Sequence, residues 1–254
     1  MSGPFVTSEL GENHVGVVRL CQPPNNFFSL AMIEAVADAL EAFDRDRSCR
    51  SVVLAAEGKH FCAGADFASP ATYSTADLYA AAVRLFRTSK PIVAAVQGAA
   101  IGGGLGVALS ADFRIATPQA RFSANFARLG FHHGFGLSVT LPGVVGQQRA
   151  AELLYTGRRI DGDEAAAIGL VDRVVPSDQL ESAALDLAAE IAASAPLAVQ
   201  SIRATLRADL ADRVAAATDR ELTEQERLRH TDDFIEGTRA MAERRTPNFT
   251  GVEQ

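Results

Sequence analysis

The stretch AAIGGGLGVALSAD, residues 99–112, places three contiguous glycines between a strand-like apolar run and a helix-like apolar run. The first N–H groups of a helix lack internal partners and carry positive partial charge. Glycine lets a ligand atom approach such groups closely. This junction can therefore form a phosphate cradle or an oxyanion hole. Close packing of a helix against a sheet accounts for the same glycines equally well.

Two phosphate-binding patterns fail at this junction. A P-loop carries a lysine and then a serine or threonine after its glycines, whereas residues 105–107 read Leu-Gly-Val. The dinucleotide pattern GxGxxG requires spaced glycines, and the glycines at 102–104 are contiguous. An oxyanion hole and close packing remain as interpretations of the run.

A second stretch of small residues follows another strand-like run. SVVLAA (51–56) leads into EGKHFCAGADF (57–67). Together, GKHFCAGAD and AAIGGGLGVALSAD resemble the enoyl-CoA hydratase/isomerase family, also called the crotonase superfamily. The resemblance extends in order from about residue 10 to about residue 250, through KPIVAAVQG (90–98), ADFRIAT (111–117), TGRRIDGDEAAAIGLVDRVV (156–175) and DDFIEGTRAMAERRTPNF (232–249).

The resemblance implies a substrate and a way of polarising it. In this family two backbone N–H groups hold the thioester carbonyl of a coenzyme A substrate, and the matching motifs place these groups on Ala65 and Gly103. One preorganised donor of this kind is worth about 3–4 kcal/mol. Coenzyme A would then be part of the substrate, with no separate cofactor and no metal. By resemblance the substrate also lies along Ala63, Asp66, Phe67, Ala68 and Gly102.

Two glutamates that activate water in the hydratases of this family are missing. The first would follow the glycine run, where this chain has Gly106, and the second would stand at Phe126. Hydration of a 2-enoyl thioester needs one group to take a proton from water and another to protonate Cα. Neither residue can do either. Gly106 either leaves space for a ligand or marks a site that has drifted.

Two adjacent histidines follow Phe126 in RLGFHHGFGLSV (128–139). The loop can reach the same corner of the pocket, so we expect His132 to carry proton transfer and His133 to lie beside the substrate or to face outward. An apolar corner would keep a histidine neutral and able to accept a proton near pH 7. A surface or packing role for either histidine is the alternative.

Other polar residues receive mainly structural interpretations. We expect His60 to belong to its loop, Asp66 and Asp112 to cap a turn and a helix end, and Cys62 to be a buried thiol. Tyr73 and Tyr79 fall where the family has a mobile flap, and either could reach the substrate. Arg244 and Arg245 are candidates for the coenzyme A phosphates, because by resemblance the C-terminal helix closes over the coenzyme. A solvated helix end is the alternative for both arginines.

These sites require alternating strands and helices to position them. Apolar, β-branched runs at 14–20, 51–56, 91–96, 113–117 and 170–175 predict strands covered on both faces. Helical periodicity marks 30–46 and 75–89, with Thr75 as an expected N-cap. Alternation of this kind predicts a parallel sheet. The expected fold class is α/β, and the resemblance makes it a crotonase-like spiral of ββα repeats.

The hydrophobic pattern of the sequence changes from residue 177 onward. Only helical patterns occur there, and Pro196 stands at an expected helix start. We divide the chain into an α/β core, residues 1–195, and a C-terminal helical region, residues 196–254. The resemblance implies a homotrimer or a dimer of trimers, with the helical C-terminus as an assembly surface.

Composition narrows the class of protein. The chain has 254 residues and a formal net charge of −7, which argues against a general nucleic-acid binder because such proteins present a basic face. The N-terminus lacks a secretory signal pattern, and no run of eighteen apolar residues indicates a membrane span. Three cysteines without metal-binding spacing favour a reduced, cytoplasmic setting.

We therefore expect an acyl-CoA-binding enzyme that stabilises a thioester enolate or oxyanion, as a lyase or isomerase. A weak hydratase with a substitute acid or base is one alternative. A C–C hydrolase acting on CoA thioesters and a non-catalytic acyl-CoA-binding protein are the others.

Overall fold

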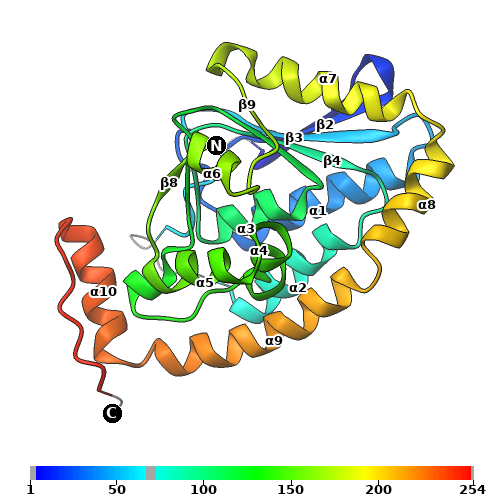
Figure 1. Ribbon diagram of the computed structural model, residues 1–254. Helices are drawn as coiled ribbons and strands as arrows, with labels where there is room; N and C mark the ends of the chain where they lie inside the picture. Colours follow the sequence, from blue (N-terminus) through cyan, green and yellow to red (C-terminus); the bar gives the residue numbers. More distant parts are fainter. Residues whose placement is uncertain (1–3, 67–72, 253–254) are drawn as a thin grey trace.

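The computed structural model describes residues 4–66 and 73–252 (Figure 1). The larger of its two sheets has the strand order β1-β2-β3-β4-β6-β9, and the smaller has the order β5-β7-β8. The strands of the larger sheet are β1 (Val6–Leu10), β2 (Val15–Leu20), β3 (Ser51–Ala56), β4 (Ile92–Val96), β6 (Phe113–Ala116) and β9 (Arg173–Val174). Those of the smaller sheet are β5 (Ala99–Ile101), β7 (Arg121–Ser123) and β8 (Ile160–Asp161).

Helices cover both faces of the larger sheet, as the continuous apolar runs predict. Every residue of β3 is buried, and its alternate side chains face different layers. Val52 and Leu54 pack with α1 (Leu30–Arg45) and α2 (Thr75–Phe86). Val53 and Ala55 pack with α7 (Leu180–Ala192), which lies across the opposite face in Figure 1. The parallel pairing of β2, β3, β4, β6 and β9 confirms the predicted parallel sheet.

The structure corrects several details of the predicted elements. Only Arg173–Val174 of the run 170–175 forms a strand, and β1, β7 and β8 were not expected. Ser74, not Thr75, caps α2, because its hydroxyl accepts a hydrogen bond from the Asp77 N–H. Pro196 begins α8 as predicted.

The remaining helices connect and cover the core. They are α3 (Gly103–Ser110), α4 (Leu137–Val145), α5 (Gln147–Thr156), α6 (Gly162–Ala167), α8 (Pro196–Leu206), α9 (Leu210–Leu228) and α10 (Asp232–Glu243), with short 3-10 turns at Glu12–His14, Asn125–Leu129 and Ser177–Gln179. The α9 helix packs on α2 and α4, and α10 packs on the Asn125–Leu129 turn. The C-terminal helices thus close over the same side of the core as α3.

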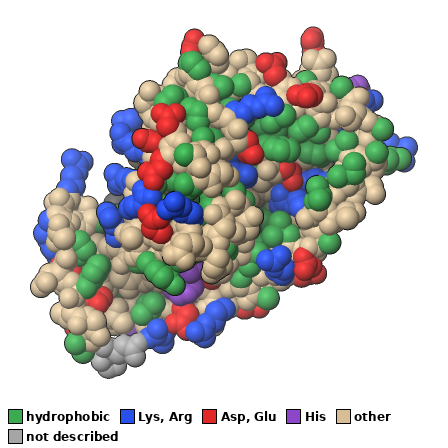
Figure 2. All heavy atoms as spheres, in the orientation of Figure 1, with side chains coloured by type: hydrophobic (Ala, Val, Ile, Leu, Met, Phe, Trp, Pro, Cys, Tyr) green, Lys and Arg blue, Asp and Glu red, His purple; other side chains and the backbone are tan. Residues whose placement is uncertain are grey.

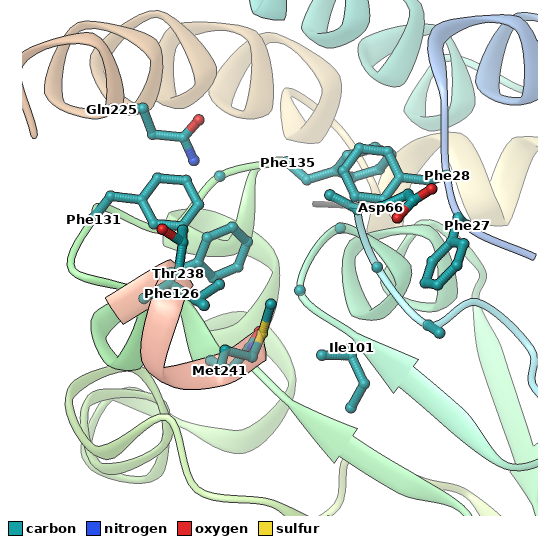
Figure 3. Close-up of a pocket in the computed structure, with 18 of the residues that line it drawn as sticks. Phe27, Phe28, Asp66, Ile101, Phe126, Phe131, Phe135, Gln225, Thr238 and Met241 are labelled. Carbon is teal, nitrogen blue, oxygen red and sulfur yellow. The ribbon is translucent and has the colours of Figure 1, made fainter. Parts of the chain in front are cut away.

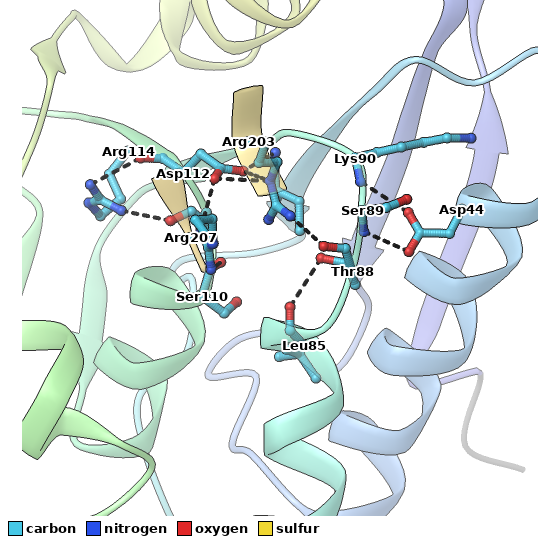
Figure 4. Close-up of polar contacts among 12 residues, drawn as sticks. Asp44, Leu85, Thr88, Ser89, Lys90, Ser110, Asp112, Arg114, Arg203 and Arg207 are labelled. Carbon is cyan, nitrogen blue, oxygen red and sulfur yellow. Dashed lines mark hydrogen bonds and ion pairs between the residues drawn. The ribbon is translucent and has the colours of Figure 1, made fainter. Parts of the chain in front are cut away.

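Asp112 ties the helical C-terminus to the larger sheet (Figure 4). Its carboxylate accepts hydrogen bonds from the Ile92 N–H at 2.8 Å, from Arg203 Nε at 2.9 Å and from Arg207 Nη1 at 2.8 Å. Arg203 also donates to the Thr88 carbonyl. The structural role expected for Asp112 is confirmed, and its two arginine partners come from α8 and the residue that follows it.

Within residues 4–66 and 73–252, no single helix is both long and apolar enough to cross a membrane. One bent pair, Ser177–Ala192 with Pro196–Leu206, meets the length and composition criteria only when its two helices are joined across a 104° break.

Candidate active site

At each position of the glycine run a different structural constraint requires glycine. Gly102 has φ +56° and ψ −118°, a backbone conformation that L side chains rarely adopt. A Cβ on Gly103 would meet the Phe28 ring, and a Cβ on Gly104 would collide with the Cys62 carbonyl. The run therefore lets α3 begin in direct contact with the second glycine loop, so close packing is one reason for these glycines.

The second loop lies directly beside the start of α3. The Ile101 N–H donates to the Cys62 carbonyl at 3.1 Å, and the Phe28 N–H donates to the Gly64 carbonyl at 3.1 Å. Gly64 has φ +90°, and a Cβ there would approach the Ile101 carbonyl at 2.9 Å. These contacts place Ala65 and Gly103 on one cavity. Cys62 is buried, and burial raises the pKa of its thiol to about 12, which confirms the buried, inert thiol.

That cavity has a volume of about 830 Å³. Of the residues expected to touch substrate, Ala63, Ala65, Asp66, Gly102, Gly103 and Phe126 line it. Phe67 and Ala68 lie outside the described residues. The backbone N–H groups of Ala65 and Gly103 donate no hydrogen bond to any residue in the described ranges. Two residues from different segments, whose N–H groups have no described acceptor, therefore line one cavity.

Gly106 lies elsewhere, and the structure explains why it is glycine. It is fully buried in α3 and does not line the cavity, because the Phe135 ring packs against it so closely that a Cβ would collide. Phe135 is 1% exposed and meets Phe28 edge-on, with ring centroids 6.3 Å apart. The interpretation of Gly106 as space for a ligand is therefore wrong: an aromatic ring of the chain itself fills that space.

Aromatic side chains form much of the cavity wall (Figure 3). Phe126, which stands where the resemblance places the second glutamate, packs against Phe131 with ring centroids 5.4 Å apart. Phe27, Phe28 and Phe135 complete the aromatic lining. No periodic pattern predicts these contacts, because the rings come from loops that only the tertiary fold brings together.

Neither histidine of the 128–139 segment lines the cavity, so the prediction that His132 faces the pocket is wrong. The chain turns toward α9 at this point: His132 Nδ1 donates to the His133 carbonyl at 2.7 Å, and the His132 carbonyl accepts from Gln225 Nε2 at 2.9 Å. The two imidazole rings stack with centroids 4.1 Å apart. The expected contact of His133 with substrate is wrong for the same reason.

His133 instead belongs to a buried polar network on α9 and α4. Its Nε2 lies 2.8 Å from Ser138 Oγ, and Ser138 Oγ donates to Glu221 Oε1 at 2.7 Å. Glu221 also accepts from the N–H groups of Gly136 and Ser138, at 2.8 and 3.0 Å. Burial lowers the pKa of His133 to about 4 and raises the pKa of Glu221. The network caps α4, which begins at Leu137.

Three other titratable side chains line the cavity. His60 lines it, and its Nδ1 accepts from the Ala99 N–H at 3.1 Å, so its role is structural but not confined to the loop. Burial and the nearby Lys59 and Arg121 lower the pKa of His60. Asp66 supplies the single carboxylate among the described lining residues. Tyr79 lines the cavity, whereas Tyr73 does not, and burial raises the pKa of Tyr79 well above its ordinary value.

The two arginines expected at the coenzyme phosphates line a second cavity, of about 1080 Å³. It shares Asn125, Leu129, Arg159 and Met241 with the first. Arg245 pairs with both Glu236 and Glu243, so its charge is already compensated. Arg244 ends α10 with φ +56° and forms no such pair among the described residues.

Further arginines at the first cavity were not anticipated from the sequence. Arg121, Arg159 and Arg239 line the first cavity and form no ion pair with any described residue. No group of three or more metal-binding side chains occurs in the described part of the chain.

The combination of fold and paired loops matches known proteins over nearly the full chain. The sequence model of the enoyl-CoA hydratase/isomerase family matches residues 11–252. Enoyl-CoA hydratase EchA19 of Mycobacterium tuberculosis is 33% identical over 261 residues, covering 98% of this chain and 97% of that protein. Carnitinyl-CoA dehydratase of Proteus mirabilis is 32% identical over 243 residues, covering 91% and 93%. The chain therefore belongs to the enoyl-CoA hydratase/isomerase family.

A solved structure supports the same assignment. The enoyl-CoA hydratase/isomerase from Pseudoalteromonas atlantica T6c superposes with a TM-score of 0.88 at 33% identity, covering 97% of this chain and all of that one. The expected crotonase-like α/β fold is confirmed. The chain is an acyl-CoA-processing member of this family.

Proposed function

We propose that the protein binds an acyl-CoA thioester with its carbonyl oxygen between the backbone N–H groups of Ala65 and Gly103. The observation that carries the proposal is that both donors lack a partner among the described residues and line the same cavity. Gly103 is the first residue of α3, so the positive end of the helix adds to the field at that point. An enolate or a tetrahedral oxyanion formed from the thioester would be stabilised there.

The residues at the two expected glutamate positions argue against ordinary hydration. Phe135 fills the space beside Gly106, and Phe126 presents a ring to the cavity. Asp66 is then the carboxylate able to move a proton at the thioester, and we assign proton transfer to it. Enolate stabilisation with one carboxylate fits an isomerase or a decarboxylating lyase, because neither reaction requires a second group to activate water.

A non-catalytic acyl-CoA-binding protein is the second candidate. The observation that favours it is the same aromatic replacement, which removes both acid–base groups and leaves the carbonyl site intact. Turnover of a panel of acyl-CoA thioesters, followed by mass spectrometry, separates the two candidates. Asp66→Asn should lower any turnover by about 10²–10⁴-fold while thioester binding persists. Turnover that survives Asp66→Asn would refute the assignment of Asp66.

The coenzyme phosphates have a different set of candidate partners from the one expected. Arg121, Arg159 and Arg239 line the main cavity without an ion pair to any described residue, and Arg244 lines the adjoining cavity. Arg245 would have to leave two carboxylates to bind a phosphate. We therefore propose the first four for the phosphates, and expect their replacement by glutamine to weaken binding more at low salt than at high salt.

Self-association is part of the proposal. Hydrophobic side chains gather on the α7–α8 side of the molecule in Figure 2. On α8, Leu197 and Leu206 are each 80% exposed and Ile202 is 59% exposed. Burying such side chains between copies would remove them from water, and we propose a homotrimer or a dimer of trimers. Light scattering of the wild type and of Leu197→Glu tests this proposal.

Calorimetric titration tests the carbonyl site directly. Hexanoyl-CoA should bind more tightly than hexanoic acid and more tightly than S-hexyl-CoA, the thioether that lacks the carbonyl. Two hydrogen bonds worth about 1 kcal/mol each predict a difference of about tenfold or more between thioester and thioether. Equal affinities of thioester and thioether would refute the carbonyl site. Crotonyl-CoA hydration at the rate of an ordinary two-glutamate hydratase would refute the proposed chemistry.

A further inference from the structure

We propose that the side of the cavity next to α9 recognises a hydrogen-bond-accepting oxygen on a ring-bearing acyl group, through the Tyr79 hydroxyl that lies beside the Gln225 amide. The inference rests on the proposed binding of an acyl-CoA thioester and names the class of acyl group. It comes from the polar groups and the aromatic walls at this side of the cavity.

The walls favour a ring over a flexible chain. Phe28, Phe126, Phe131 and Phe135 line the cavity from three segments of the chain, and their rings meet at an angle to one another. Flat aromatic faces set at angles pack well against another ring. An unbranched acyl chain would lose rotational freedom in the same space, and that ordering costs free energy.

The Tyr79 hydroxyl is a donor without an acceptor among the described residues. Tyr79 is 6% exposed and lines the cavity, and the Phe135 N–H and the Gln225 amide face its oxygen. No described residue accepts a hydrogen bond from its O–H. Gly134 lies against the phenol oxygen so closely that any side chain there would displace it. Burying a donor without a partner costs free energy, so a ligand acceptor at this point would be stabilising.

The Gln225 amide is held in one orientation beside this hydroxyl. Gln225 is 2% exposed, its Nε2 donates to the His132 carbonyl at 2.9 Å, and its Oε1 lies 3.5 Å from Arg229 Nη2. Figure 3 shows the amide directed toward the space between the aromatic rings. With its oxygen turned to Arg229, the amide turns its N–H groups toward the His132 carbonyl and the Tyr79 oxygen. The Tyr79 O–H is therefore the donor left for a ligand, and the complementary ligand group is an acceptor.

The surroundings of this pair keep the Tyr79 phenol in its donor form. The buried Glu221 carboxylate and the Arg229 guanidinium both act on Tyr79, with opposite effects on its pKa. Burial and Glu221 together keep the phenol protonated, so it remains a donor. A ketone on a ring supplies the acceptor that such a donor needs.

Four thioesters test the inference by calorimetric titration: octanoyl-CoA, cyclohexylacetyl-CoA, and the 3-oxo and 4-oxo derivatives of cyclohexylacetyl-CoA. Each acyl group has the same number of carbons. We expect cyclohexylacetyl-CoA to bind more tightly than octanoyl-CoA, and one oxo derivative to bind about 3- to 10-fold more tightly than cyclohexylacetyl-CoA. In Tyr79→Phe the oxo preference should vanish. Tyr155→Phe, which removes an exposed hydroxyl, should behave as the wild type.

The outcomes separate this inference from the function on which it rests. Failure of all four thioesters to bind would overturn the proposed function, and the inference with it. Binding without an oxo preference, or a preference that survives Tyr79→Phe, would overturn the inference alone. Octanoyl-CoA binding as tightly as the ring compounds would overturn the assignment of a ring. The wild-type comparison needs no variant, so the inference stays testable even if Tyr79→Phe fails to fold.

Discussion

Replacing Gly106 by alanine tests whether the Phe135 ring explains the missing glutamate. In an isolated helix this change stabilises by up to about 1 kcal/mol, because alanine has the higher helix propensity. Here a Cβ would collide with Phe135, which is 1% exposed and packs edge-on against Phe28. Overpacking of a buried site costs about 1–3 kcal/mol. We expect Gly106→Ala to lower the free energy of unfolding by about 1–2 kcal/mol.

Gly143→Ala is the matched control. Gly143 lies inside α4, and a Cβ added there would meet no heavy atom within 4 Å. Helix propensity alone then applies, and this variant should be about 0.5–1 kcal/mol more stable than the wild type. Denaturant unfolding of both variants at one protein concentration gives the comparison. Phe135→Leu, combined with Gly106→Ala in a double-mutant cycle, should recover part of the loss because it removes the ring edge.

Opposite signs for the two alanine variants are the decisive result. If Gly106→Ala stabilises the fold as much as Gly143→Ala does, the Phe135 ring does not occupy the space beside position 106. Packing by that ring would then not explain why position 106 lacks a glutamate. The same geometry predicts that Gly106→Glu destabilises the fold without creating hydratase activity on crotonyl-CoA. Appearance of that activity in Gly106→Glu would also contradict the packing argument.

Further predictions concern the buried polar networks. Asp112→Asn should destabilise by about 3 kcal/mol in denaturant unfolding, because Arg203 and Arg207 lose their shared carboxylate while remaining largely buried. An unchanged free energy of unfolding for Asp112→Asn would show that water stabilises the two arginines as well as the carboxylate does. His132→Gln should leave acyl-CoA binding unchanged in calorimetry, since His132 does not line the cavity. Below pH 6.5 the unfolded chain protonates His133 while the folded chain, with a pKa of about 4, does not, so stability should fall as pH drops from 6.5 to 4. His133→Gln should reduce that loss of stability. A pH profile identical to that of the wild type would show that His133 is not its cause.

The glycine loops could be predicted from the sequence because their chemistry is local. A strand followed by glycines and a helix creates unpaired N–H groups wherever it occurs, and two such junctions on neighbouring strands must lie close together. The buried parallel strands could also be predicted from the sequence. Residues 51–56, for example, are apolar without alternation and form a strand covered on both faces. The structure brings both junctions to one cavity, as their positions on neighbouring strands predict.

The side-chain part of the site was harder to predict for a physical reason. Gln225 reaches the cavity from α9, far along the chain, and a glutamine on an amphipathic helix carries no signal of its partner. The position of His132 depends on a turn in which Phe135 has φ +64°, a conformation that few non-glycine residues adopt. Sequence spacing placed the histidines near Phe126, but the direction of the turn decides which side chains enter the cavity.

That turn accounts for the aromatic composition of this corner of the cavity. With Phe135 in the left-handed region, its ring enters the space beside Gly106, and the preceding Gly134 can lie against the Tyr79 hydroxyl. A glutamate at position 106, where the resemblance would place one, and the ring of Phe135 cannot both occupy that space. Phe126 and Phe135 instead bring apolar rings to the cavity beside the Tyr79 hydroxyl. Such a corner suits the proposed function, in which an acyl group is held away from water while two backbone donors bind its thioester carbonyl.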